Sequence, residues 1–150
     1  MKYRLLTIAA MLVAAVMLSA TSGFSVIPNR IMANVPFSFM VGSTMLPAGE
    51  YEFSTPNVNS DYTLLIRQTN GHHSILVQAM PVYEEGSRTV PKTELVFDRV
   101  GNKEFLRQVW EAGFQTGDQL LQPRSEREML AQAGENHMSH RIDAYPVRSQ

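Results

Sequence analysis

Two pairs of alternating apolar segments, each joined by a two-residue turn signal, constrain the fold of this chain most. The first pair, 62–69 and 72–79, is separated by Asn70-Gly71, and the second pair is separated by Gly101-Asn102. Asn-Gly favours the positive φ angles of a type I′ turn, whereas Gly in the first position favours type II′. Both turn types connect antiparallel strands, so the sequence predicts two β-hairpins.

The register of the first hairpin follows from its turn. Pairing outward from the turn predicts two apolar cross-strand pairs, Leu64 with Val77 and Ile66 with Ile75. These four side chains share one face, while the opposite face also carries polar groups. One buried face and one solvated face is the usual arrangement of antiparallel strands.

The second hairpin, 93–100 and 103–110, carries large apolar residues on both faces. Its predicted register places Arg99 opposite Glu104, an ion pair worth ~0.2–1 kcal/mol. On one face, the same register brings together four apolar side chains, namely Leu95, Phe97, Leu106 and Trp110. The other face receives Val96, Phe105 and Val109 together with Glu94, Asp98 and Arg107. We therefore expect this hairpin to be covered on two sides.

Upstream of the hairpins, the segment 34–41 alternates apolar and other residues and predicts a further strand. Pro36 cannot donate a hydrogen bond to a neighbouring strand, which favours an edge position or a strand start. Residues 46–49, Leu-Pro-Ala-Gly, predict a tight turn. Extended structure is expected to resume after it, with Tyr51 and Phe53 on one side.

A single short helix is predicted near 125–133. Ser125 and Glu128 have the spacing of a capping box, in which each side chain bonds the other residue's backbone amide. Gly134 is a favourable helix stop. The remaining residues, 134–150, show little periodicity and are interpreted as a loosely ordered tail.

The N-terminal segment 1–22 has the three parts of an export signal. Lys2 and Arg4 precede an apolar run over 5–18, and small polar residues follow. The alternative is a retained membrane anchor, which needs roughly 20 apolar residues, more than this run supplies. We expect cleavage after Ser22 and an exported product, periplasmic or secreted.

Composition bounds what the exported part can be. Residues 23–150 hold 11 basic and 14 acidic side chains, a net charge near −3. This charge does not indicate the basic surface that nucleic-acid binding requires. Contact with a membrane is expected only through the signal segment, if it stays uncleaved. The chain has no cysteine, which excludes disulfides, thiol catalysis and a cysteine-acylated lipoprotein. One domain, 23–133, is expected from the length.

The residues that could carry chemistry do not form a recognisable site in the sequence. His72 and His73 are adjacent, so they face opposite ways on a strand, and His137 and His140 lie in the tail. Glu84-Glu85 is interpreted as a solvated loop, and Glu94 with Asp98 as surface carboxylates. No nucleophile elbow, Ser-x-x-Lys motif or phosphate-binding glycine loop occurs. No catalytic, cofactor-binding or metal-binding residue is therefore predicted.

The aromatic residues have two possible uses, as core or as an exposed row that stacks on sugars. Core is favoured for the strand aromatics, because aromatics at a spacing of two usually fill it. This set comprises Phe37, Phe39, Tyr51, Phe97, Phe105 and Trp110. Exposure is expected instead for Tyr83, Phe114 and Tyr145, which fall in loops or the tail.

Several motifs together resemble a group of small exported bacterial β proteins. They are Asn34-Val-Pro-Phe-Ser-Phe-Met-Val-Gly42, Leu46-Pro-Ala-Gly-Glu-Tyr51, Leu95-Val-Phe-Asp-Arg-Val-Gly101 and Phe105-Leu-Arg-Gln-Val-Trp110. The likeness covers roughly 33–133. It implies export and a compact β fold, and it assigns no catalytic or binding residue.

The sequence thus predicts an all-β, mainly antiparallel domain, a sandwich or partly open barrel of about seven strands with one short C-terminal helix. Three functions remain open. A non-enzymatic structural or interaction module of the cell envelope, with an unknown envelope or extracellular partner, is favoured. A small-ligand or glycan-binding module is the alternative, and a small hydrolase has the least support.

Overall fold

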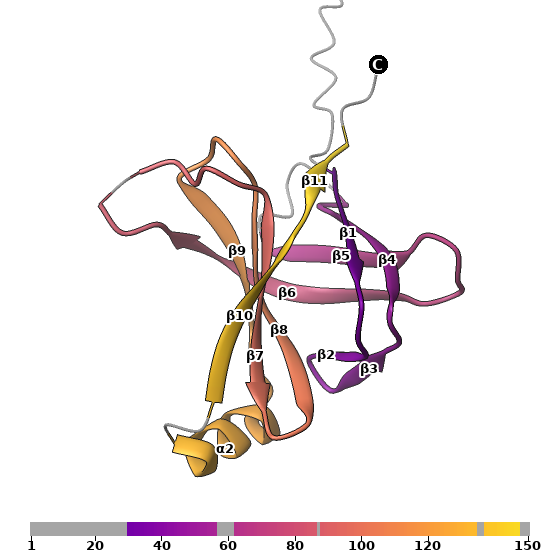
Figure 1. Ribbon diagram of the computed structural model, residues 1–150, viewed down its shortest axis with the longest axis vertical. Coiled ribbons are helices and arrows are strands. Elements are labelled where there is room, and N and C mark those ends of the chain that lie inside the picture. Colours follow the sequence, from indigo (N-terminus) through magenta and orange to yellow (C-terminus); the bar gives the residue numbers. More distant parts are fainter. Residues whose placement is uncertain (1–29, 57–61, 87, 135–136, 148–150) are drawn as a thin grey trace, which may run out of the picture.

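The computed structural model describes residues 30–56, 62–86, 88–134 and 137–147 (Figure 1). The signal peptide expected at 1–22 lies outside the described residues. The strands are β1 (Arg30–Val35), β2 (Phe39–Val41), β3 (Thr44–Leu46), β4 (Gly49–Ser54), β5 (Thr63–Gln68), β6 (Ser74–Tyr83), β7 (Glu94–Val100), β8 (Lys103–Trp110), β9 (Thr116–Leu120), β10 (His137–Asp143) and β11 (Tyr145–Pro146), and the helix α2 (Arg124–Ala133) lies between β9 and β10.

All these strands join in one mixed sheet, with the order β10-β7-β8-β9-β6-β5-β4-β1-β11. The long strand β6 links two halves, because its residues 74–78 pair with β5 and its residues 79–83 pair with β9. The β2–β3 hairpin attaches to β8 through a parallel pairing. The all-β, sandwich-like prediction with one helix is confirmed. The sheet does not close into a barrel, and the described residues form eleven strands where about seven were expected.

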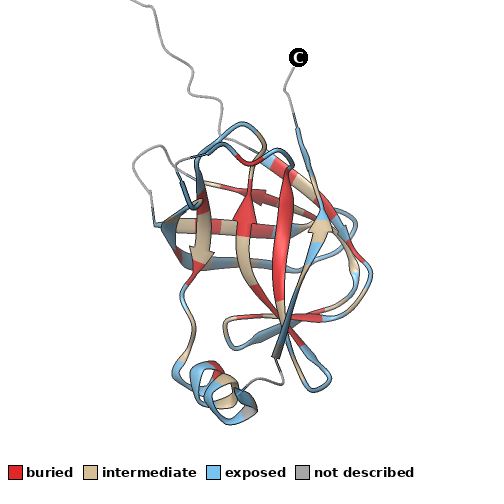
Figure 2. Cartoon of the chain, turned by 60° about the vertical axis from the view of Figure 1, so that its left-hand side comes forward, coloured by how far each residue is buried: buried red, intermediate tan, exposed pale blue. Residues whose placement is uncertain are grey.

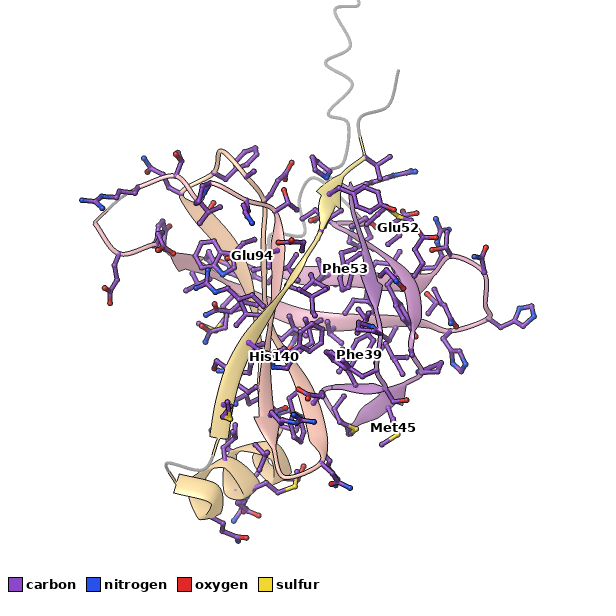
Figure 3. All side chains as sticks on the ribbon, in the orientation of Figure 1. Phe39, Met45, Glu52, Phe53, Glu94 and His140 are labelled. Atoms are coloured by element: carbon purple, nitrogen blue, oxygen red, sulfur yellow. The ribbon has the colours of Figure 1, made fainter. Side chains whose placement is uncertain are left out.

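The two halves of the sheet enclose one hydrophobic core. Phe39 connects them, because its ring lies 5.1 Å from that of Tyr51 on β4 and 5.5 Å from that of Phe97 on β7, edge to face in both cases. Phe39 and Phe53 are labelled in Figure 3, and both are almost fully buried. Buried residues concentrate on the strands, while the surface of α2 is largely exposed (Figure 2).

The first hairpin has the predicted register. Leu64 pairs with Val77 and Ile66 with Ile75, and Leu64 and Ile66 belong to the core. The turn differs from the prediction, because the Gln68 amide donates to the His73 carbonyl at 2.8 Å and Gly71 does not have a positive φ. The connection is therefore longer than a two-residue type I′ turn.

The second hairpin keeps its predicted register only near the turn. Arg99 opposes Glu104 with an N–O distance of 3.0 Å, and Gly101 has a φ of 62°. The register then shifts between Val96 and Phe97. This β-bulge reverses the faces of the later residues. Val109 consequently lies in the main core, and Trp110 packs on the other face, against Val90 and Val96.

The predicted strand over 34–41 is divided at Pro36. β1 ends at Val35 and β2 begins at Phe39, because proline cannot supply the backbone donor that a continued ladder requires. The chain passes here from β1 in one half of the sheet to β2 against β8 in the other. The core positions are retained, since Val35, Phe39 and Val41 are all buried.

The predicted turn at 46–49 is fastened by Tyr51. The Tyr51 side chain is fully buried, and its hydroxyl donates to the Pro47 carbonyl at 2.7 Å. A tyrosine that bonds backbone a few residues upstream also stabilises corners in other β-sandwiches.

Tyr51→Phe is expected to lower the free energy of unfolding by about 0.5–1.5 kcal/mol, because it leaves a carbonyl without its donor. Chemical denaturation measures this difference. Tyr145→Phe is the matched control, since the Tyr145 hydroxyl donates to Glu50 at an exposed site. Equal losses for both variants would contradict a specific role of the Tyr51 hydroxyl.

The helix begins one residue earlier than predicted and without the capping box. Pro123 precedes its first residue, no side chain caps it, and Glu128 accepts a hydrogen bond from Arg124 at 2.8 Å. The helix ends at the predicted Gly134, which has a φ of 53°.

The Glu126 side chain on α2 is buried. Burial raises the pKa of its carboxyl group, and the charge of Arg107 on β8 acts in the opposite direction without cancelling this rise. The Glu126 carboxyl also accepts a hydrogen bond from the Gln122 side chain at 3.2 Å.

The C-terminal segment 134–150 contains structure that the sequence analysis missed. Residues 137–143 form β10, which pairs along the whole of β7, and β11 continues onto β1. Three consecutive side chains lie within 4 Å of carboxylates of β7 or β8. They are Ser139 with Asp98, His140 with Glu104 and Arg141 with Glu94. The prediction of a loosely ordered tail is therefore wrong for 137–147.

Candidate functional site

A cavity of about 160 Å³ lies among the ends of several strands. Figure 1 shows the strand ends that surround it, at the end of the molecule away from α2. It lies where β1 begins and β4 ends, and where β8 turns into β9. Its described lining comprises Ile31, Phe53, Ser54, Thr55, Leu64, Pro81, Val109, Glu111, Phe114, Thr116, Gly117 and Asp118. A cavity at the end of a β core, lined by apolar residues and a few polar groups, is a common form of ligand site.

Strand alternation brings two carboxyl groups to this cavity. Asp118 is two residues from Leu120 on β9, and Leu120 belongs to the core. Glu111 is likewise two residues beyond the core residue Val109. Because successive side chains on a strand alternate between faces, both acids continue a core-facing row at the point where the core ends. In addition, Asp118 pairs directly with Val109 and with Pro81.

Both carboxyl groups are partly removed from water. Burial raises the pKa of Asp118 above its ordinary value, and burial also raises the pKa of Glu111. The cause in each case is loss of hydration of the charged form. The described lining residues include no lysine, arginine or histidine. Raised carboxyl pKa values inside a cavity are typical of functional sites.

The rim of the cavity is held by backbone hydrogen bonds. The Val90 amide donates to the Phe114 carbonyl at 3.0 Å, and the Gly113 amide donates to the Val90 carbonyl at 2.9 Å. Gly117 permits close packing of Trp110, because a Cβ atom there would lie 2.6 Å from the indole ring. Trp110 is the only tryptophan in the chain, so its fluorescence reports on this end of the molecule.

Asp118→Asn is expected to stabilise the protein at neutral pH. Folding raises the pKa of the Asp118 carboxyl, so the folded protein favours its protonated form. The contribution of this group to stability is complete below its ordinary pKa of 3.8, and it is lost as the pH rises through the raised pKa. The amide cannot ionise, so it avoids that loss. We expect a higher melting temperature than wild type at pH 7, and no gain at pH 3. Each kcal/mol corresponds to roughly 4 °C.

Asp143→Asn is the matched control, because the Asp143 side chain is 83% exposed. It should leave the melting temperature nearly unchanged at both pH values. A gain at pH 7 that is equal in the two variants, or absent from both, would contradict the burial of the Asp118 carboxylate.

The residues weighed in the sequence do not assemble into a site. His72 and His73 are exposed beside the first hairpin turn, and His137 occupies the first position of β10. Glu85 is exposed and Glu84 is half-buried. Glu94 and Asp98, predicted to be surface carboxylates, are buried or half-buried. They bind Arg141 and Arg107, the latter at 2.8 Å.

His140 is the one histidine with described contacts to an acid. Its Nε2 atom lies 3.7 Å from Oε2 of the buried Glu104. The imidazole stacks on the Phe97 ring at 5.8 Å and meets the Phe37 ring edge to face at 5.5 Å. Figure 3 shows His140 on β10, and His140 does not line the cavity. These contacts give His140 a structural role in holding β10.

The aromatic residues follow the sequence prediction. Tyr51, Phe39, Phe97, Phe105 and Trp110 are buried, and Phe37 is half-buried against Phe97. An exposed row of these residues for sugar stacking is therefore absent. Tyr83, Phe114 and Tyr145 are exposed, as expected.

Sequence reasoning missed Glu111 and Asp118. Neither belongs to a motif, and Glu111 follows a strand whose later register is changed by the bulge. The available signal was the position of Asp118 in the segment 116–120, two residues before a core leucine.

The comparisons with known proteins add no relative. No family model matches the chain, and neither the curated proteins nor the solved structures contain a match.

Among the described residues, no helix has the length and apolar character needed to cross a membrane. The same residues contain no group of three or more His, Cys, Asp or Glu side chains that could hold a metal ion.

Proposed function

We propose that this protein is an exported, non-enzymatic binding domain that holds a small ligand in the cavity at the β8–β9 end. The single observation that carries the proposal is the pair of desolvated carboxyl groups, Glu111 and Asp118, in that cavity. Carboxyl groups whose pKa is raised by burial inside a cavity are a physical indication of a functional site.

The cavity favours ligand binding over the two other candidate functions. A purely structural module does not require a cavity at one end of its core. Hydrolysis has less support, because the residues described around the cavity provide hydroxyl groups but no histidine or basic side chain to assist them.

Export rests on the sequence of the segment 1–22 and on the resemblance to small exported proteins. Lys2, Arg4 and the apolar run at 5–18 support a cleaved signal. N-terminal sequencing of the protein made in its native host is expected to start at Gly23. A product that still starts at Met1 would contradict the proposal of cleavage.

Ligand binding can be tested with a fragment set that contains neutral, cationic and anionic compounds. Ligand-observed NMR on residues 23–150, the expected exported product, should find binders that are lost in Thr116→Trp, which places a large ring at the cavity wall. Thr44→Trp is the matched control, because Thr44 is exposed on β3 and does not line the cavity. Fragment binding that is absent, or equal in both variants, would overturn the proposed function.

A further inference from the structure

The connection between β5 and β6 contains the dipeptide Asn70-Gly71. It projects from the body of the molecule (Figure 1), and both residues are exposed. A type I′ turn would fix both of them with positive φ. The structure instead closes the connection with the hydrogen bond from the Gln68 amide to the His73 carbonyl, and residues 69–72 lie outside the strand ladder. The dipeptide is therefore not held in a two-residue turn.

The chemical groups of this dipeptide are free to meet. In the part of the chain that the structure describes, neither the Asn70 side chain nor the Gly71 amide makes a hydrogen bond. Gly71 has no side chain that would obstruct its own nitrogen, and its backbone is permissive. The nitrogen of Gly71 and the Cγ atom of Asn70 are separated by three bonded atoms, so a bond between them closes a five-membered ring.

We propose that Asn70 is a site of spontaneous deamidation. The Gly71 backbone nitrogen loses its proton and attacks Cγ of Asn70. A C–N bond forms, the bond from Cγ to Nδ2 breaks, and ammonia leaves with the proton that the nitrogen lost. Water then opens the resulting succinimide ring at one of its two carbonyl carbons. The products are aspartate or isoaspartate at position 70, and water is the only co-reactant.

The modification changes the surface of the hairpin and leaves its core contacts in place. Either product adds one negative charge, and isoaspartate also adds one methylene group to the main chain of the connection. The pairs Leu64–Val77 and Ile66–Ile75, which hold the hairpin, lie within the ladder. We therefore expect the register to persist, and the modified fraction to record the age of the protein. This inference does not depend on the proposed ligand site.

Asn102 provides a control in the same chain. It is also exposed in a hairpin connection, where it lies between Gly101 and Lys103. Lys103 pairs with Val100 directly after this turn, so the residue that follows Asn102 begins the ladder. Its side chain also crowds the nitrogen that would attack. We expect Asn102 to stay intact while Asn70 reacts.

The experiment incubates residues 23–150, the expected exported product, at pH 7.4 and 37 °C in water enriched in oxygen-18. Peptide mass spectrometry is expected to find aspartate and isoaspartate at position 70, each with one oxygen-18 atom from the water that opens the ring. Gly71→Ala should slow the conversion by about tenfold, because a Cβ atom hinders the nitrogen. This Cβ atom would overlap the end of the Gln68 side chain, so circular dichroism of the variant verifies its fold. Asn70→Gln, which does not alter Gly71, should also remain unconverted.

Lys103→Gly separates the effect of the structure from that of the dipeptide. It creates a second Asn-Gly pair, in a connection of two residues, and we expect Asn102 in this variant to react about tenfold more slowly than Asn70 because a tight turn restrains both residues. Equal rates would show that the open connection is not the cause. If Asn70 stays intact in the folded chain but reacts in urea, the fold protects it and the proposed site is overturned. Conversion without uptake of oxygen-18 would overturn the succinimide route.

Discussion

Phe97→Ala is expected to lower the free energy of unfolding by about 3–5 kcal/mol, the usual cost of removing a buried phenylalanine ring. Phe97 is fully buried on β7, where its ring contacts Phe37, Phe39 and His140. These contacts join β7 to the β1–β2 connection, to β2 and to β10. Domains are stable by only about 5–15 kcal/mol in total, so the loss should be evident in chemical denaturation.

Phe114→Ala is the matched control for this change. It deletes the same atoms at a position that is 46% exposed in the loop before β9, and it should cost less than about 1 kcal/mol. If both variants lose the same stability, or if Phe97→Ala loses less than about 1 kcal/mol, Phe97 does not occupy the centre of the core.

Ending the chain at Gly134 is expected to unfold the domain or to cost at least about 4 kcal/mol. The deletion removes β10, whose seven residues all pair with β7, together with the Arg141–Glu94 and Ser139–Asp98 contacts. It also uncovers Phe97, whose burial alone has the value of a core aromatic. Circular dichroism and denaturation of the shortened chain measure the effect.

Point variants keep this prediction testable if the shortened chain does not fold. Ile142 packs partly buried against the core, so Ile142→Ala should cost about 1–2 kcal/mol, less than at a fully buried position. Met138 lies on the same strand but is 70% exposed, and Met138→Ala should have little effect. A shortened chain as stable as the full one would show that β10 is dispensable.

The parts of the fold predicted from sequence depend on local patterns. The pairs Leu64–Val77 and Ile66–Ile75 follow from alternation and the position of a turn, which lie within a few residues of each other. The faces on which Val109 and Trp110 lie are the reverse of the predicted ones, and this reversal could not be predicted in the same way. It results from a bulge in the middle of the hairpin, where the sequence has no glycine or proline to indicate one.

β10 was missed because its attachment is long-range. Ser139, His140 and Arg141 form no apolar alternation, and they resemble a solvated tail when considered alone. Their partners Asp98, Glu104 and Glu94 lie at least 36 positions away in the sequence. A strand held largely by polar pairs across the sheet has no local periodicity that predicts it.

The candidate site was missed for a related reason. Glu111 and Asp118 become a pair only when the end of β8 and the start of β9 surround the same cavity. Their meaning depends on burial, which raises the pKa of each carboxyl group. The sequence shows two acids seven positions apart, and this spacing alone indicates no function.

The most direct test of the cavity as a site that contains a partly buried acid is an NMR titration of the Asp118 carboxyl carbon. Without ligand, we expect a pKa above the ordinary value of 3.8, because burial disfavours the charged carboxylate. A pKa at or below 3.8 would contradict the burial of this charge at the cavity.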